Sequence, residues 1–424
     1  MRRPPPGFLP LLSRKCLLSS GIHALGLPGQ SLRPASAGTV TALGRPSGRP
    51  FWSSPPLRGL SGFHRALVMS SSRSPAPPPE LDAAAMAAAA ADWPANTPTV
   101  SPGFVAAHPR GILLLDATWT VPGAPPPDAA TPRLTSAAAR LDIDAVADAT
   151  SPLPHMLPDV ATWAAAAASV GLTPDTPVVV YDGGGQYVAS ARGWWMCRVF
   201  GVRRVAVLEG GAPAWVAAGL PTASSDTPIP SMSAPAAVQG GGSSNGHGNG
   251  DGGGWTVDEG LVWSAAAVAA NAAASPPPVR LLDARSAGRY AGVAPEPRPG
   301  VRGGHVPRSG SLPWTAVMAT GGGGGGGSGV GLRPVRELAS AFLDAGVRLG
   351  PGGAPPPRLA LTCGSGVTAA VVALAAAAVG EWRVPIYDGS WSEWGAREDL
   401  PVATGVETEE IVASPGGSVS GRKV

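Results

Sequence analysis

Acidic residues are missing from the first 79 positions of the chain, and lysine is almost absent throughout. The first carboxylate belongs to Glu80, and the only lysines are Lys15 and Lys423. Residues 1–79 instead carry arginine with serine, proline and leucine, a composition typical of an organelle transit peptide. A nucleic-acid-binding arm is the competing interpretation, but no interleaving of aromatic and basic residues supports it. We therefore predict a disordered transit peptide over 1–79 and a mitochondrial location, with plastid or dual targeting left open.

Long apolar runs and paired cysteines are missing as well. No run of about 18 residues is free of charges and glycine breaks, and the alanine tract at 83–91 is too short to span a membrane. Three cysteines spread over 424 residues do not form a disulfide framework, which indicates a reducing compartment. His247 lies alone among glycines and asparagines, so we expect it to be solvated rather than bound to a metal.

The chain contains an internal repeat. Three segments of the first half resemble three of the second, namely 111–119 and 279–287, 176–195 and 358–376, and 205–221 and 384–401. The first pair aligns Asp116 with Asp283, and the third aligns Trp215 with Trp394. Continuous apolar strands separated by helical stretches indicate a parallel sheet built from α/β units. We therefore expect two copies of one α/β domain, each with a central, mostly parallel sheet flanked by helices.

Composition sets the predicted domain boundaries. We expect a first α/β domain over 100–230, a flexible glycine-rich linker over 231–254, a second domain over 255–404 and a disordered tail over 405–424. The glycine run at 321–329 is predicted to be a surface-loop insertion in the second domain.

Cys363 carries the strongest chemical signal in the sequence. It ends an apolar strand of the second copy, where Asp182 stands in the first, and α/β sheets bind ligands at that end. The glycines after it let the backbone curl with its amides inward, and the next helix adds its positive dipole end. A cysteine held there should be largely thiolate and reactive, although a buried structural cysteine is the plainer alternative. The residues predicted to bind the anion are Gly364, Gly366, Val367 and Thr368.

The residues after Cys363 limit the classes of reaction that this cysteine could carry out. A cysteine phosphatase needs an arginine near the end of the loop to grip phosphate, and none is present at 367–370. A cysteine hydrolase needs a histidine base and an orienting partner, with water as second nucleophile. A sulfur transferase needs only a thiolate and amides that stabilise a persulfide anion.

The loop CGSGVTA (363–369) and the segment YDGSWSEWG (387–395) resemble the tandem rhodanese-domain sulfurtransferases, especially the branch acting on 3-mercaptopyruvate. SPLPHMLPD (151–159) and GRYAGVAPEPR (288–298) extend the resemblance. In this family the first domain is inactive and has aspartate at the cysteine position, as Asp182 here. In this family a characteristic turn usually precedes an acidic stretch of the first domain. That turn is not preserved in residues 133–144 of this chain, which weakens the match of Asp144 to the family aspartate.

The resemblance implies a role for each matching residue. Cys363 would accept the sulfur, and Arg289 and Arg298 would hold the substrate carboxylate in bidentate hydrogen bonds. Ser365, His155 and Asp144 would assist proton transfer across an interdomain cleft. The plainer alternatives are solvated arginines, a helix-capping serine, a structural histidine and a turn-capping aspartate.

We therefore predict an enzyme that moves sulfur from 3-mercaptopyruvate, through a cysteine persulfide, to cyanide, thioredoxin or a small thiol, with release of pyruvate and without a metal or organic cofactor. The first alternative is the same fold with thiosulfate as donor, disfavoured by the absence of a basic residue after Cys363. The second is a non-catalytic rhodanese module that carries sulfur or docks a protein. No nucleic acid or membrane partner is predicted.

Overall fold

The computed structural model describes residues 76–119, 133–135, 138–223, 228–234, 254–319, 331–349 and 359–405. The predicted transit peptide up to residue 75, the linker from 235 to 253 with His247, the glycine run at 321–329 and the tail beyond 405 lie outside the described residues. Within the described ranges, no helix is both long enough and apolar enough to cross a membrane.

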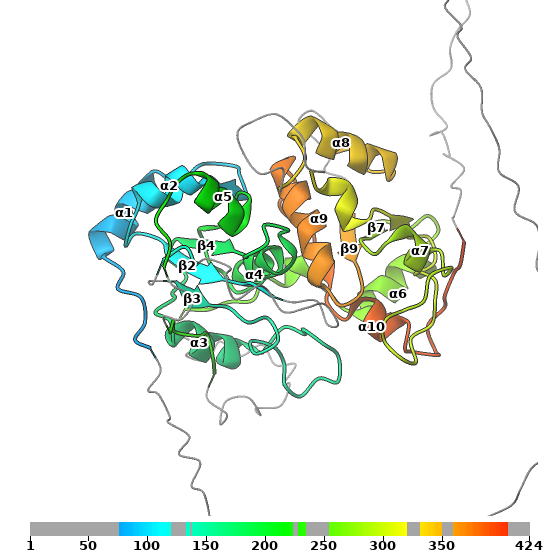
Figure 1. The fold of residues 1–424 in the computed structure, drawn as a ribbon. Helices are drawn as coiled ribbons and strands as arrows, with labels where there is room; N and C mark the ends of the chain where they lie inside the picture. Colours follow the sequence, from blue (N-terminus) through cyan, green and yellow to red (C-terminus); the bar gives the residue numbers. More distant parts are fainter. Residues whose placement is uncertain are drawn as a thin grey trace, which may run out of the picture. The chain divides into compact units, whose positions relative to one another are not determined.

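Five parallel strands form the first sheet, in the order β1-β5-β4-β2-β3 (Figure 1). They are β1 (Thr99–Val100), β2 (Leu113–Asp116), β3 (Ala139–Arg140), β4 (Val178–Tyr181) and β5 (Val205–Leu208). The surrounding helices are α1 (Ala83–Ala91), α2 (Pro102–Ala107), α3 (Val160–Ala168), α4 (Val188–Val199) and α5 (Gly211–Ala217). Every residue of β2, β4 and β5 is buried, as expected of parallel strands covered on both faces.

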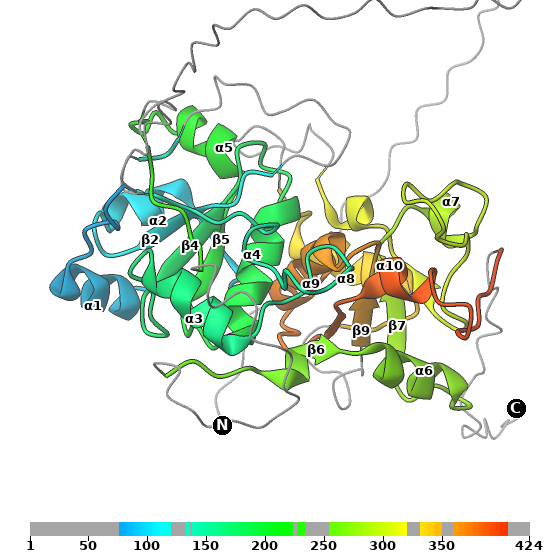
Figure 2. The same cartoon turned by 90° about the horizontal axis from the view of Figure 1, so that it is seen from below.

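The second sheet repeats this topology in the order β6-β10-β9-β7-β8, again with parallel neighbours. Figure 2 labels its strands β6, β9 and β7. Its strands are β6 (Val262–Trp263), β7 (Arg280–Asp283), β8 (Gly310–Ser311), β9 (Leu359–Thr362) and β10 (Ile386–Tyr387). Its helices are α6 (Ala265–Ala273), α7 (Ala287–Tyr290), α8 (Val335–Asp344), α9 (Val367–Ala378) and α10 (Ser390–Trp394), with the short 3₁₀ helices η1 (Glu259–Leu261) and η2 (Trp314–Val317). The predicted fold class is confirmed.

The two units agree in detail at the ends of their central strands. Asp116 pairs with Tyr181 in the first sheet as Asp283 pairs with Thr362 in the second. Asp182 and Cys363 directly follow the second member of each pair, so they occupy equivalent positions. The indole nitrogens of Trp215 and Trp394 also match, since they donate to the carbonyls of Pro221 at 2.9 Å and Pro401 at 2.7 Å.

Helices α4 and α9 join the two units in one core, and they lie side by side in Figures 1 and 2. A single hydrophobic cluster includes Val178 and Trp194 from the first unit and Leu361 and Val371 from the second. Helix α9 is made of alanine, valine, leucine and one threonine, and small side chains allow helices to approach closely. The helices that follow the two equivalent loops are therefore packed against each other.

Two described segments differ from the predicted boundaries. Helix α1 precedes residue 100 yet belongs to the first unit, because its Ala89 is fully buried in that unit's core. At the other end, residues 231–234 lie along β3 rather than in a linker. The Met232 side chain is fully buried there, and its amide donates to the Arg140 carbonyl at 2.8 Å. Alanine-rich and proline-rich composition concealed both packed segments.

Candidate active site

The Cys363 loop is a tight turn between β9 and α9. Cys363 is 1% exposed, and the turn closes at Gly366, whose φ of 73° places it in the left-handed region. A Cβ at position 366 would lie 2.9 Å from the Asp388 carbonyl oxygen, so glycine is required there for space as well as for backbone conformation.

The segment that begins α10 holds this loop in shape. The Ser390 hydroxyl accepts hydrogen bonds from the amides of Cys363 at 3.2 Å and Gly366 at 3.0 Å, and it donates to the Tyr387 carbonyl at 2.7 Å. The Ser392 hydroxyl donates to the Gly364 carbonyl at 2.6 Å. The Gly366 amide is therefore occupied by Ser390 rather than free for a ligand.

The amides of Gly364 and Ser365 remain open. Within the described ranges, no protein acceptor is bonded to either of them. They belong to the turn that leads into α9, whose first turn is Val367–Ala370 and whose N-terminal dipole end favours negative charge. Backbone amides and a helix N-terminus beside a buried cysteine can stabilise an anion formed on its sulfur.

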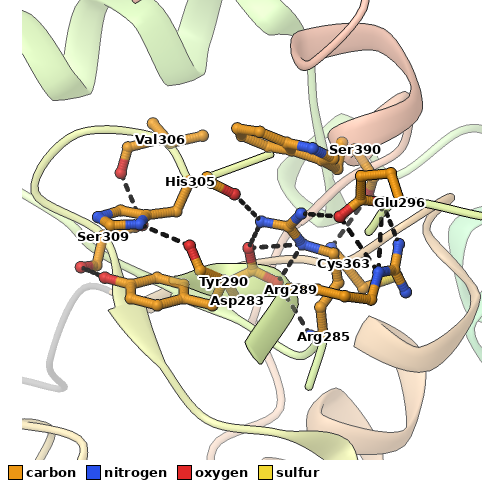
Figure 3. Close-up of polar contacts among 12 residues, drawn as sticks. Asp283, Arg285, Arg289, Tyr290, Glu296, His305, Val306, Ser309, Cys363 and Ser390 are labelled. Carbon is orange, nitrogen blue, oxygen red and sulfur yellow. Dashed lines mark hydrogen bonds and ion pairs between the residues drawn. The ribbon is translucent and has the colours of Figure 1, made fainter. Parts of the chain in front are cut away.

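Arg289 lies directly against this loop, since its Nη2 would be 3.1 Å from a Cβ at Gly364. Its guanidinium is held by Glu296, with Nε 3.2 Å from each carboxylate oxygen and Nη2 2.6 Å from Oε2. Glu296 also accepts from Nη1 of Arg285 at 2.8 Å, so one carboxylate joins two arginines (Figure 3). Nη1 of Arg289 has no bonded acceptor in the part of the chain that the structure describes.

Arg285 is a buried support for this arrangement. It is 1% exposed, binds the Asp283 carboxylate through Nε and Nη2 at 2.6–3.1 Å, and lies 4.2 Å above the ring of Trp391. Its Nη2 also donates to the Gly304 carbonyl at 2.7 Å. Because its own charge is matched by Asp283, Arg285 fixes Glu296 without depending on it alone.

Arg298 is half-buried and interacts electrostatically with both Cys363 and Arg289. Burial lowers its pKa most, the positive charge of Arg289 lowers it further, and the negative charge of a Cys363 thiolate opposes both effects. Among the described residues no hydrogen bond or ion pair to its side chain is present, so its full guanidinium fork can receive an anion.

His155 reaches the site from the first unit. Its Nδ1 is 2.6 Å from Oδ1 of Asp144, and Oδ2 of Asp144 accepts from the Trp119 indole at 2.9 Å. Burial lowers the pKa of His155, the Asp144 charge opposes this, and the Arg192 and Arg298 charges lower it further. The imidazole is therefore neutral at neutral pH, with Asp144 positioned to orient it.

Arg192 connects the His155 segment to the cysteine loop. It is completely buried, and its Nη1 is 2.7 Å from Oδ1 of Asp388 and 3.4 Å from the Gly366 carbonyl oxygen. Its Nη2 donates to the carbonyl of His155. Oδ2 of Asp388 in turn accepts from the Leu157 amide at 2.8 Å. The two units are thus bonded to each other beside the reactive turn.

Asp182 fills the equivalent turn of the first unit with its own side chain. Its Oδ2 accepts from the Tyr187 amide at 2.9 Å and the Ser190 hydroxyl at 2.7 Å. Burial raises the pKa of Asp182, and hydrogen bonds from Ser190 and from the amides of Gly185, Gln186 and Tyr187 oppose that rise. The first unit therefore has an amide cradle already occupied by a carboxyl group.

The structure gathers most of the sequence-predicted residues in one place. Arg289 and Arg298 lie near Cys363, and His155 contacts Asp144. Ser365 is buried, but no hydrogen bond between it and His155 is present within the described ranges. Val367 and Thr368 lie in the first turn of α9.

Sequence reasoning missed several polar residues that hold this site together. They are Trp119, Arg192, Arg285, Glu296, Asp388 and Ser390. Glu296 lies in GRYAGVAPEPR (288–298), and Asp388 and Ser390 lie in YDGSWSEWG (387–395), so their place beside a reactive loop is a sequence signal for a supporting role. Arg192 has no local signal, because its partners are far away in sequence.

Comparisons with known proteins agree with this geometry. A family model described as a rhodanese-like domain matches residues 147–218. The 3-mercaptopyruvate sulfurtransferase of Escherichia coli (strain K12) is 35% identical over 294 residues, which cover 69% of this chain and 92% of that protein. Thiosulfate/3-mercaptopyruvate sulfurtransferase 1, mitochondrial, of Arabidopsis thaliana is 35% identical over 327 residues, covering 72% of this chain and 78% of that protein.

The crystal structure of SseA from Escherichia coli matches with a TM-score of 0.54 and 30% identity, covering 70% of this chain and 100% of that one. This chain has two parallel-sheet units of equivalent strand order, and the second carries the Cys363 turn. The chain therefore belongs to the tandem rhodanese-domain sulfurtransferases, enzymes that transfer sulfur, and is similar to those named 3-mercaptopyruvate sulfurtransferase.

Proposed function

We propose that the protein takes sulfur from 3-mercaptopyruvate and holds it as a persulfide on Cys363. The observation that carries this proposal is a combination at one turn: a buried cysteine and, among the described residues, unbonded amides at Gly364 and Ser365 and two arginines with unbonded donors. The donor carboxylate would bind Arg298 and Nη1 of Arg289, and its thiol sulfur would then face Cys363.

The first step breaks the carbon–sulfur bond of the donor. The Cys363 thiolate attacks the donor sulfur, and the electron pair of the broken bond stays on carbon as the pyruvate enolate. His155, neutral and oriented by Asp144, accepts the proton of the donor thiol and returns it to the enolate. The products are pyruvate and a Cys363 persulfide anion, which the Gly364 and Ser365 amides stabilise.

The second step passes the outer sulfur to an acceptor. Cyanide would leave as thiocyanate, with the Cys363 thiolate regenerated. A small thiol or thioredoxin would take the sulfur as its own persulfide, and a second thiol would then form a disulfide and release hydrogen sulfide.

Intact-protein mass spectrometry tests the persulfide. After incubation with 3-mercaptopyruvate, the protein should gain the mass of one sulfur atom, and Cys363→Ser should gain none. Cys197→Ser is the matched control, because the Cys197 thiol is fully buried and burial raises its pKa to about 12, so this variant should still gain the sulfur. An adduct that persists in Cys363→Ser would refute the mechanism.

Thiosulfate is the competing donor, since the Arabidopsis relative is named for both compounds. Comparing kcat/KM for the two donors decides between them. A protein that binds partners but turns over neither donor would instead be a non-catalytic sulfur-carrier or docking module.

We also propose a mitochondrial location. It is supported by the acid-free, arginine-containing segment 1–79 and by the mitochondrial designation of the Arabidopsis relative. A fluorescent fusion to residues 1–79 that does not enter mitochondria would overturn it.

A further inference from the structure

Glu296 is the carboxylate that limits the positive charge of the anion-binding site. Its side chain is only 4% exposed, and within the described ranges its hydrogen bonds and ion pairs are to Arg285 and Arg289. It occupies Nε and Nη2 of Arg289 and leaves Nη1 for an anion (Figure 3). One edge of this arginine is thus closed to ligands by the protein itself.

The charge around the anion site can be counted from these ion pairs. Three guanidinium groups, those of Arg285, Arg289 and Arg298, face two carboxylates, those of Asp283 and Glu296. These five side chains together therefore carry one net positive charge, before the Cys363 thiolate is counted. The adjacent buried pair of Arg192 with Asp388 adds none, and the Asp144 side chain is 57% exposed and screened by water.

We propose that Glu296 is a specificity-determining residue that favours donors with a single negative charge over the dianion thiosulfate. This inference rests on the proposed function of the same site. With the Cys363 thiolate counted the site is neutral, so a carboxylate monoanion such as 3-mercaptopyruvate adds one excess negative charge and thiosulfate adds two. The Coulomb energy is proportional to the product of the two charges. Removing the Glu296 charge makes the site more positive by one unit, and this lowers the interaction energy of a dianion by twice as much as that of a monoanion.

The test uses the full chain and follows the ratio of two kcat/KM values, that for thiosulfate divided by that for 3-mercaptopyruvate. Glu296→Gln removes the charge with little change in shape and should raise the ratio about tenfold, equivalent to about 1.4 kcal/mol. Glu296→Asp keeps the charge and should leave the ratio within about twofold of the natural protein. Glu337→Gln, an exposed position on α8, is the remote control and should change nothing.

The ratio does not depend on the fraction of protein that is active, so partial unfolding of a variant cannot mimic the effect. An unchanged ratio in Glu296→Gln, or an equal rise in Glu296→Asp, would overturn the role of the charge. If the unsubstituted protein uses neither donor, the proposed function fails, whereas normal 3-mercaptopyruvate turnover with an unchanged ratio defeats only the role of Glu296.

Competitive inhibition gives a second measurement that needs no variant. Pyruvate, a monoanion, should inhibit the 3-mercaptopyruvate reaction of the natural protein more strongly than sulfate, a dianion. Stronger inhibition by sulfate would contradict the proposed preference even if Glu296→Gln failed to fold.

Discussion

Arg192 and Asp388 form an ion pair that is almost completely buried and joins the two units beside the reactive turn, with Nη1 2.7 Å from Oδ1. Replacing Arg192 by methionine leaves the Asp388 carboxylate buried without its partner. We expect this to lower the free energy of unfolding by about 3–5 kcal/mol, because an uncompensated buried charge is costly. Urea denaturation measures the loss.

The double variant Arg192→Met with Asp388→Asn should recover part of that stability, since it removes both charges together. Arg203→Met is the matched control, because the Arg203 pair with Asp175 is exposed and such pairs contribute about 0–1 kcal/mol. Equal losses from the buried and the exposed pair would show that the connection between the units is weak.

The pH dependence of turnover should reveal His155. Burial lowers its pKa below the usual 6.5, so the neutral, proton-accepting form persists below that pH. The acid limb of kcat/KM that belongs to His155 should therefore lie below pH 6.5, and it should disappear in His155→Asn. The Asp144 charge raises this pKa, so Asp144→Asn should move the limb to still lower pH. A limb that moves upward would contradict the assigned contact.

Ser390 should matter although it need not touch the substrate. Its hydroxyl accepts from two buried amides of the cysteine loop, and Ser390→Ala leaves both without an acceptor. We expect a stability loss of about 1–3 kcal/mol and a fall in kcat/KM of about tenfold or more. Ser340→Ala, on the exposed side of α8, serves as the control for both measurements. Full activity in Ser390→Ala would mean that the loop keeps its shape without this support.

The first unit should not become active when it is given a cysteine. Asp182→Cys in a Cys363→Ser background replaces a carboxyl group that binds the Tyr187 amide and the Ser190 hydroxyl. The variant should lose about 1–3 kcal/mol of stability and gain no sulfur from 3-mercaptopyruvate. Intact mass checks this, and a sulfur adduct on the new side chain at position 182 would prove the prediction wrong.

The repeat made the fold predictable, because each central strand is short, apolar and followed by a turn and a helix in both halves. The Cys363 turn was visible for the same reason, since glycines and a cysteine at a strand end are local signals. The contacts of Arg192 could not be predicted from the sequence, because Arg192 and Gly366 are 174 positions apart in the chain. Leu157 and Asp388, which are hydrogen-bonded at the same interface, are 231 positions apart. Helix α1 was missed because a run of alanines has no apolar stripe that would mark a packed face.

The shared core around α4 and α9 has a consequence for how far the two units can be separated. The first unit has Asp182 in place of a cysteine, yet its α4 covers α9, the helix that follows Cys363. A gene shortened to the second copy alone would expose the apolar face of α9 and lose His155 as well. The unit without a cysteine therefore completes the hydrophobic core of the unit that carries Cys363.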